Sequence, residues 1–336
     1  MSTEWDRIQL AHGGGGTWMQ QLIDAELRRL YPDPQQLLHD AACLDLPHGR
    51  LAFSTDGYVV HPLEFEGGDI GRLAVTGTAN DLAMAGARPL HLSLGLILEE
   101  GFERERLRRI VTSIATTAHS CGVTIATGDT KVVERGKGDG VFITTSGIGL
   151  LESPRPIQPE AIEPGDQLLV SGDLGRHGLA ILAARHGLQL EPPVASDCAP
   201  LWPEVESLLQ RGVVPHCLRD LTRGGLASAV HELATARGVE MVIHEERLPV
   251  LEVVSRSCDL LGFEPLHLAN EGRMVLVLAP DDLETALELL EPLGAAWIGS
   301  VQALPAETNG RVLLRTPFGS ERRLLPLSGE LLPRIC

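Results

Sequence analysis

The sequence predicts two α/β domains in one chain, and three observations support this prediction. Its 336 residues exceed what one hydrophobic core ordinarily serves, and two domains of about 150 residues each are expected at this length. Short apolar runs typical of strands alternate with segments of helical spacing in both halves. Residues 152–165 contain four prolines, which predicts a connection between the domains.

The first half is expected to contain four strands and two main helices, after a helix that begins at Thr17. Residues 51–55 form an apolar run typical of a strand. Residues 71–87 are rich in small residues and predict a helix that stops before Pro89. Residues 90–98 carry leucine at alternate positions, which favours a strand. After these come a helix, from the spacing of Leu107, Ile110, Val111, Ile114 and Ala118 up to Gly122, and strands at 123–128 and 141–150.

The second half alternates strands and helices in the same way. The predicted strands are 167–172, 239–243, 274–279, 295–301 and 311–316, and the predicted helices are 174–186, 201–211, 225–237, 250–261 and 281–293. We therefore expect an N-terminal domain at 1–152, a C-terminal domain at 153–325 and a tail at 326–336.

Composition limits the possible functions. A hydrophobic content of 43% with 22% charged residues is typical of a folded, water-soluble protein. The formal net charge of −17 argues against a general nucleic-acid binder. No segment approaches the roughly 20 apolar residues of a membrane span, and the N-terminus lacks the basic and apolar regions of a signal peptide. We expect a cytoplasmic protein that contacts neither nucleic acid nor membrane.

The six cysteines occur without a CxxC motif. In a reducing cytoplasm most of them are expected to be small buried hydrophobic residues. Cys336 differs because it is the last residue, so nothing follows it that could bury it in a regular element. Chain ends are usually mobile, and a thiol placed there is suited to reactive chemistry.

A glycine segment precedes the first predicted helix, at residues 12–16 (HGGGG). Gly13, Gly14, Gly15 and Gly16 leave backbone N–H groups able to approach a phosphate closely, and the helix from Thr17 would add its positive dipole end. The alternative is a flexible linker, because a glycine run is weak evidence alone.

Three aspartates adjoin small residues at the ends of predicted elements. They are Asp56, Asp81, which follows Asn80, and Asp129. Strand ends are where α/β folds bind ligands, and Mg²⁺ prefers oxygen ligands such as carboxylates. Any one of them could instead form a turn or cap a helix, but together they predict a metal–phosphate site. Lys131 could neutralise a transferring phosphoryl group there, or be an ordinary surface lysine.

Two further polar clusters lie in the second half. In residues 219–226 (RDLTRGGL) two glycines precede a predicted helix, so its N-terminus and Arg223 could hold an anion. Alternatively, Asp220 or Thr222 simply caps that helix. In residues 270–272 (NEG), Glu271 could act as a general base in a closed site, although the motif could be only a turn.

Taken in order, these motifs resemble the HypE family of hydrogenase maturation factors, which are carbamoyl dehydratases. The resemblance covers residues 8–336 and rests on HGGGG, FSTD, GTANDLAMAGARP, TGDTKVV, RDLTRGG, NEG and the terminal PRIC. The internal motifs are shared with a superfamily that includes aminoimidazole ribonucleotide synthetase, selenophosphate synthetase and thiamine-monophosphate kinase, whereas PRIC is specific to the HypE family. Residues 31–50 match no motif that we can assign.

The resemblance implies a two-domain PurM-like α/β fold with ATP near the domain junction. The N-terminal domain would form a barrel with that of a second chain, in a homodimer. Asp56, Asp81 and Asp129 would hold Mg²⁺, the glycines would cover the phosphates, and Lys131 would contact the transferring phosphoryl group. The other residues assigned to the site are Asn80, Asp220, Arg223 and Asn270.

The resemblance also implies an activity. A HypF-type carbamoyltransferase would attach a carbamoyl group to Cys336, ATP would phosphorylate the carbamoyl oxygen, and loss of phosphate would leave a protein-bound thiocyanate. Glu271, assisted by Lys131, would remove the nitrogen protons. A HypC–HypD complex would then accept the cyanide for the iron of [NiFe]-hydrogenase.

Two alternatives follow from the same residues. One is another ATP-using member of the superfamily, such as a selenophosphate synthetase-type phosphotransferase. That enzyme carries its reactive residue near the N-terminal glycines, where this chain has no cysteine. The other is a non-catalytic scaffold whose tail is a docking peptide, which predicts no ATP turnover and normal partner binding by Cys336→Ser.

Overall fold

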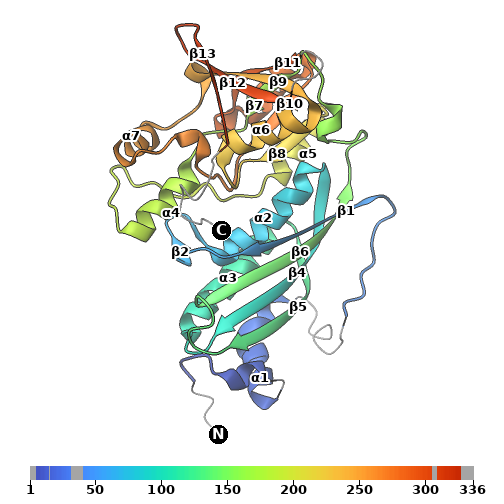
Figure 1. The fold of residues 1–336 in the computed structure, drawn as a ribbon. Helices are drawn as coiled ribbons and strands as arrows, with labels where there is room; N and C mark the ends of the chain where they lie inside the picture. The colour runs from blue at the N-terminus through green and yellow to red at the C-terminus, as the bar shows by residue number, and fades with distance from the viewer. Residues whose placement is uncertain (1–4, 15, 32–40, 305–308, 327–336) are drawn as a thin grey trace.

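The described residues fold into two large β-sheets, one in each half, with helices packed on them, and a small two-stranded sheet (Figure 1). The computed structural model describes residues 5–14, 16–31, 41–304 and 309–326. Cys336 and Gly15 lie outside the described residues. Within the described ranges, no helix combines the length and the apolar character needed to cross a membrane.

A four-stranded sheet in the order β1-β6-β4-β5 forms the N-terminal half. β1 (Leu51–Tyr58) and β4 (Ala87–Glu99) pair antiparallel with β6 (Val141–Leu151), whereas β4 and β5 (Thr124–Val133) are parallel. β1 and β5 are therefore the opposite edges of this sheet. The remaining elements of this half are α1 (Thr17–Leu22), β2 (Glu64–Phe65), β3 (Gly68–Asp69), α2 (Ile70–Met84) and α3 (Arg104–Ser120).

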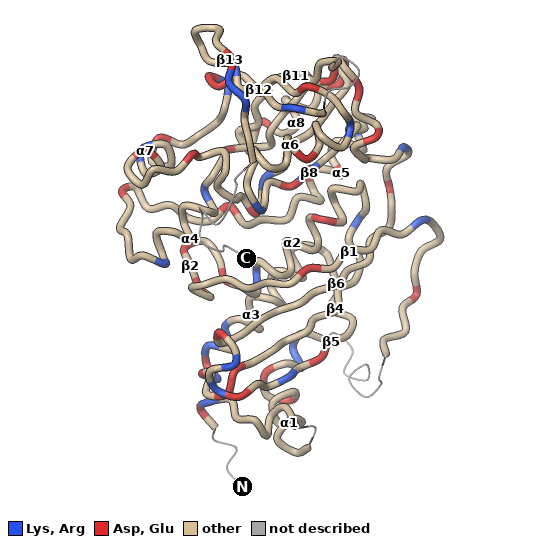
Figure 2. Tube along the Cα trace, viewed as in Figure 1, with Lys and Arg blue, Asp and Glu red and all other residues tan. Residues whose placement is uncertain are grey.

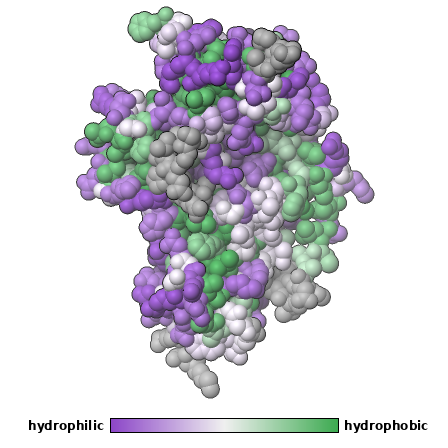
Figure 3. Space-filling view, in the orientation of Figure 1, coloured by the Kyte–Doolittle hydropathy of each residue, from purple (hydrophilic) through white to green (hydrophobic). Residues whose placement is uncertain are grey.

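The two faces of the N-terminal sheet differ in burial. β4 buries Leu92, Leu94, Leu96 and Leu98, because alternate side chains of a strand point to the same face. The other face carries exposed apolar residues, including Phe53, which is 70% exposed. Figure 3 shows apolar surface over this part of the molecule. An exposed apolar sheet face of this kind is typical of an interaction surface.

A seven-stranded sheet in the order β13-β12-β9-β11-β7-β10-β8 forms the C-terminal half. All neighbouring strands are antiparallel except β12 and β9. The strands are β7 (Gln167–Val170), β8 (Cys217–Asp220), β9 (Val239–His244), β10 (Met274–Leu278), β11 (Ala296–Ala303), β12 (Arg311–Arg315) and β13 (Glu321–Arg323). The helices are α4 (Arg176–His186), α5 (Trp202–Gln210), α6 (Gly225–Arg237), α7 (Glu252–Leu261) and α8 (Leu283–Leu290).

The expected α/β class is confirmed, but several boundaries differ from the predictions. α2 ends at Met84 and Pro89 lies inside β4, which begins earlier than predicted. β5 continues to Val133, so Asp129 lies within the strand rather than at its end. Asp56 likewise lies inside β1, two residues before that strand ends. The short strands β2, β3, β8 and β13 were not predicted.

The hydrophobic cores of the two halves are continuous across their junction. Ala83 and Met84, at the end of α2, pack in one cluster with Trp202 and Leu208 of the C-terminal half. Ile181 of α4 joins the core of the N-terminal half. Since close-packed side chains resist displacement, this shared packing fixes how the two halves are oriented around the space between them.

Candidate active site between the two domains

A cleft of about 380 Å³ lies where the two domains meet. β1 and α2 form one wall, and β8, the loop before α6 and residue 271 form the other. Figure 2 shows acidic positions on both β1 and α2. Figure 3 shows hydrophilic surface between the two halves of the molecule. We call this space the junction cleft, and its polar lining is Ser54, Thr55, Asp56, Tyr58, Asp81, Arg219, Asp220, Thr222, Arg223 and Glu271.

Three acidic residues that the sequence assigned to the site, Asp56, Asp81 and Asp220, line the junction cleft. Asp81 accepts a hydrogen bond from the Ser54 hydroxyl at 2.6 Å. Burial raises the pKa of Asp81, and the negative charge of Asp56 raises it further. Burial, with the nearby charge of Asp81, raises the pKa of Asp220 to about 7. Neighbouring carboxylates raise one another's pKa because their negative charges repel, and a divalent cation would relieve this repulsion. Carboxylate oxygens are the usual ligands of such a cation.

Positive groups lie beside these carboxylates. Arg219 and Arg223 oppose the rise in the pKa of Asp220. Helix α6 begins two residues after Arg223, and its cap is Gly224, in the left-handed conformation, without a side-chain hydrogen bond. The alternative that Asp220 or Thr222 caps the helix is therefore wrong, since the cap residue is Gly224. Guanidinium groups and a helix N-terminus fit a phosphate group.

Glu271 is 3% exposed and lines the same cleft. Its backbone N–H donates to Asp197 at 3.2 Å, and its carbonyl oxygen accepts from Asn80 at 3.3 Å. The neighbouring Asn270 accepts from the N–H of Gly175 at 2.9 Å and is itself buried. Asn80 and Asn270 thus bind protein groups here, and their roles as nucleotide ligands stay predictions.

Three other predicted residues, Asp129, Lys131 and Gly13, lie at the other edge of the N-terminal sheet. Lys131 and Asp129 on β5 form an exposed ion pair of 2.6 Å, and Lys131 lowers the pKa of Asp129. Gly13 packs against this strand, because a Cβ at Gly13 would lie 2.8 Å from the backbone nitrogen of Val132. β1 is three strand spacings away, about 14 Å along the sheet.

Within one chain, the predicted site residues therefore lie in two separate groups. The junction cleft contains Asp56, Asp81, Asp220, Arg223 and Glu271, whereas β5 and the glycine segment carry Asp129, Lys131 and Gly13. Among the residues that the structure describes, no three His, Cys, Asp or Glu side chains are placed to hold a metal ion. The predicted set of Asp56, Asp81 and Asp129 does not converge within a single chain.

Sequence reasoning missed the residues that hold the cleft together. Ser54, Tyr58, Arg219 and Asp197 lie in or directly behind the lining, and none was a predicted site residue. Ser54 lies within the FSTD motif and Arg219 within RDLTRGG, so the signal was membership of the same motifs as Asp56 and Asp220. Asp197 carried a weaker signal, as an acid in a small-residue stretch (SDCAP) outside any helix.

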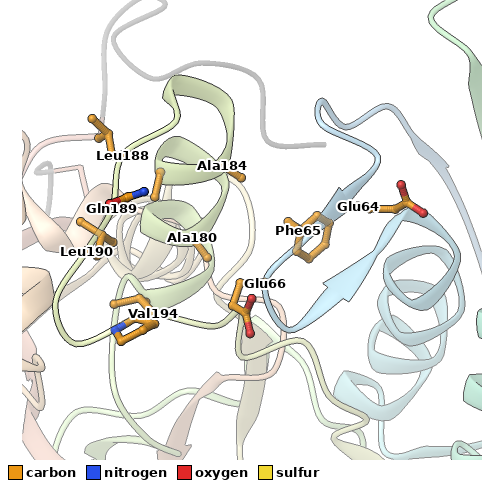
Figure 4. A pocket seen from close by; sticks show the side chains of 11 residues that line it. Glu64, Phe65, Glu66, Ala180, Ala184, Leu188, Gln189, Leu190 and Val194 are labelled. Carbon is orange, nitrogen blue, oxygen red and sulfur yellow. The ribbon is translucent and has the colours of Figure 1, made fainter.

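A larger hollow of about 700 Å³ lies between the hairpin of β2 and β3 and the helix α4 (Figure 4). Its walls are mostly alanine, leucine, proline and valine, with Phe65, Glu64 and Glu66 on the hairpin side. Among the predicted site residues that the structure describes, none lines it. The junction cleft, rather than this hollow, combines the charged groups that phosphate chemistry needs.

Comparisons with known proteins define the class to which the fold and cleft belong. Residues 38–151 match the N-terminal domain, and residues 163–308 the C-terminal domain, of the AIR synthase related proteins. These matches cover most of the chain, so it is an AIR synthase-related protein with the expected PurM-like fold.

Full-length relatives narrow this class. The chain is 47% identical to carbamoyl dehydratase HypE of Rhodobacter capsulatus, over 100% of both chains. It superimposes on a crystal structure of hydrogenase maturation protein HypE in complex with ATP with a TM-score of 0.93 and 45% identity, covering 98% of this chain and 99% of that one. A HypE–HypF complex matches with a TM-score of 0.80 and 41% identity, over 93% of this chain and 100% of that one. The chain belongs to the HypE family of carbamoyl dehydratases.

Proposed function

We propose that this chain uses ATP to dehydrate a carbamoyl group on its own Cys336 to a thiocyanate, which supplies the cyanide ligand of the [NiFe]-hydrogenase iron. One observation carries this proposal. A buried carboxylate, Glu271, lies in a cleft with acidic groups that suit Mg²⁺ and arginines that suit phosphates. The chain that carries this cleft ends in a thiol and belongs to a family of carbamoyl dehydratases.

The chemistry needs two proton removals and one phosphate transfer. The carbamoyl oxygen attacks the terminal phosphorus of ATP and ADP leaves, while the nitrogen loses its first proton. The C–O bond then breaks with release of phosphate as the second N–H proton leaves, and the product is Cys336–S–C≡N. Phosphorylation is required because an amide oxygen is a poor leaving group, whereas phosphate is a good one.

The chain's own residues supply the groups for these steps. Glu271 is the base that removes the nitrogen protons, since it lines the cleft and is only 3% exposed to competing water. Arg223 and the N-terminus of α6 bind phosphate oxygens. When bound, Mg²⁺ would neutralise phosphate charge, and Asp56 and Asp81 are the predicted metal ligands in this cleft that would help to hold it, together with phosphate oxygens.

The tail is long enough to reach this cleft. The described chain ends at Pro326, where the preceding residue, Leu325, accepts a hydrogen bond from His267 at 3.0 Å. Ten further residues lead to Cys336 and can span about 33–36 Å when extended. His267 is only four residues before Glu271 in the chain, so a tail that starts here can present its thiol to the cleft.

The functional unit in this proposal is a homodimer. The exposed apolar face of the N-terminal sheet gives two chains a surface to share, and it includes Leu51, Phe53 and Ile97. A two-fold dimer would place the β5 edge of one chain near the β1 edge of the other. The junction cleft of one chain would then receive the partner subunit's Asp129 and the partner subunit's Lys131, which complete the predicted metal and phosphate ligands together with the second chain's glycine segment.

Two partners belong to the proposal. The solved HypE–HypF complex of a relative supports a HypF-type carbamoyltransferase as the donor to Cys336. A HypC–HypD complex is the proposed acceptor of the cyanide. Both exchanges require the thiol to leave the cleft, which a residue at the chain end can do more readily than one within a helix.

Intact-protein mass spectrometry tests this function directly. The chain is incubated with ATP, Mg²⁺, carbamoyl phosphate and a HypF-type transferase, and the C-terminal peptide is weighed. A gain of about 25 Da, from one hydrogen replaced by CN, is the expected result. A gain of about 43 Da that never converts would show carbamoylation without dehydration and would contradict the proposal. No gain with an active transferase would favour the scaffold alternative.

A further inference from the structure

A short segment of the C-terminal half connects the two walls of the junction cleft. Residues 196–201 (SDCAPL), which we call the bridging segment, precede α5, and all but Ala199 and Pro200 are buried. They contact α2 of the N-terminal half on one side and the turn at residues 270–272 on the other. None of these six residues lines the cleft itself.

Asp197 is the charged residue of this segment, and it binds the turn that carries Glu271. Its carboxylate accepts the backbone N–H of Glu271 at 3.2 Å and that of Gly272 at 3.3 Å. It also accepts the side-chain amide of Asn270 at 3.0 Å. Asp197 is only 5% exposed, so these three donors replace the water that an ionised carboxylate would otherwise bind.

The other side of the bridging segment is fixed to α2. The amide of Asn80 donates to the carbonyl oxygen of Ala199 at 3.0 Å, and its oxygen accepts the N–H of Leu201 at 2.8 Å. The same amide donates to the carbonyl oxygen of Glu271 at 3.3 Å. Asn80 directly precedes Asp81, so one residue of α2 links a carboxylate of the N-terminal wall to the turn of the C-terminal wall.

The backbone N–H and the carbonyl oxygen of Glu271 therefore both form hydrogen bonds with residues outside the turn at 270–272. Asp197 holds its N–H and Asn80 holds its carbonyl oxygen. The side chain of a residue whose backbone is fixed at both ends has fewer orientations to sample. A general base benefits from this restriction, because proton removal requires its oxygen to lie within hydrogen-bond distance of the reacting group.

We propose that Asp197 is a positioning residue for the carbamoyl-dehydration reaction. Its carboxylate fixes the backbone of Glu271 and so directs the Glu271 carboxylate at the substrate nitrogen. This inference rests on the proposed role of Glu271 as the base. The requirement is for an acceptor with two oxygens. An asparagine at this position would direct its NH₂ group either at the N–H of Glu271 or at the donors of Gly272 and Asn270, and donors that face one another repel.

The test compares Asp197→Asn with Ser196→Ala, a control in the same segment. Ser196 is also buried, and its hydroxyl contacts His177 at 2.8 Å and the N–H of Cys198 at 3.1 Å, both of which lie outside the turn at residues 270–272. The measured quantities are the single-turnover rate from carbamoylated to cyanated Cys336, the Kd for ATP, and the melting temperature.

We expect Asp197→Asn to lower the single-turnover rate by about 10- to 100-fold, with the Kd for ATP changed less than about twofold. Ser196→Ala should lower the melting temperature as much or more while its rate stays within about twofold of wild type. Rates lowered equally in both variants, or a rate that falls only in proportion to ATP binding, would mean that Asp197 acts through general stability and would overturn the proposal.

The same experiment separates this inference from the function on which it rests. If wild type forms the thiocyanate and Glu271→Gln stalls at the carbamoyl stage, the proposed function stands whatever Asp197→Asn does. A wild-type rate in Asp197→Asn would then remove the positioning role alone. If wild type itself fails to dehydrate the group, the function fails first.

Discussion

His177 shows how strongly the buried domain junction acts on a single side chain. It lies on α4, with its ring in a T-shaped contact with Phe65 and its Nδ1 at 2.8 Å from the Ser196 hydroxyl. Burial lowers its pKa from 6.5 to about 4, although the charge of Asp197 opposes part of this shift. The folded chain thus keeps this imidazole neutral at pH values where the unfolded chain would protonate it.

This shift predicts a dependence of stability on pH. Between pH 6.5 and about 4 the unfolded chain binds one proton more at His177 than the folded chain, so the free energy of unfolding falls as the pH falls. The full effect is about 3 kcal/mol, since each pKa unit corresponds to about 1.4 kcal/mol. Urea unfolding of wild type and His177→Gln at several pH values measures it. The variant should lose less stability on acidification, and parallel curves would contradict the assignment.

At the residue scale, the sequence predicted side chains that face the cleft better than those that support it. Asp56, Asp81, Glu271 and Arg223 stood in compact motifs of small and polar residues, and all four line the cleft. Asp197 acts on backbone N–H groups 74 and 75 residues away in the chain. A contact with a backbone leaves no residue-type signal at its partner, so no pattern in one sequence could reveal it.

At the scale of elements, the N-terminal glycine segment depends on a close approach to β5. A short 3₁₀ turn at Leu10–Gly13 lies against this strand, and the approach leaves no room for a Cβ at Gly13. A Cβ there would lie 2.8 Å from the nitrogen and 3.0 Å from the Cβ of Val132. A Cβ on Gly16, three residues on, would have no neighbouring atom within 4 Å among the described residues.

The two glycines therefore form a matched pair for substitution. Gly13→Ala should lower the free energy of unfolding by about 1–3 kcal/mol, because the added methyl group must displace β5 or the turn. Gly16→Ala should change it by less than about 0.5 kcal/mol. Denaturant unfolding of both variants beside wild type measures the difference. Equal small effects would mean that the segment does not approach β5 this closely in solution.

Element prediction succeeded where local sequence determines the structure. α6 begins and ends as predicted, because Gly224 and Gly238 adopt left-handed conformations that stop a helix at each end. β8 was missed because it has four residues, two of them charged, and exists only through pairing with β10. β5 was predicted too short for a similar reason. Its polar residues 127–131 remain in a strand because they pair with residues 93–97 of β4.

At the scale of the whole molecule, the sheet order separates groups that the proposed reaction needs together. Glu271 lines the cleft beside β1, and Lys131 lies on β5 at the far edge of the same sheet. No pattern in the sequence could predict this separation, since it depends on which strands become edges. The proposed homodimer with shared sites would account for this separation, and that arrangement predicts complementation between two inactive variants.

Glu271→Gln and Lys131→Ala should each abolish thiocyanate formation alone. In a mixed dimer, one site combines the intact Glu271 of one chain with the intact Lys131 of the other, and the second site carries both substitutions. Random pairing of equal amounts makes about half of the dimers mixed, so about a quarter of wild-type activity should return. The measurement is the rate of thiocyanate formation after the two variants are unfolded together and refolded, with native mass spectrometry to count mixed dimers.

The control mixes Glu271→Gln with the double variant Glu271→Gln/Lys131→Ala, which leaves no dimer with an intact site and should recover nothing. Recovery in the first mixture alone would establish that Glu271 and Lys131 of different chains act on one substrate. Mixed dimers without activity would place both residues in the same chain's site. The distance of about 14 Å between the edge strands β1 and β5 would then have to shorten by movement within a single chain. The continuous core at the junction makes such a movement costly.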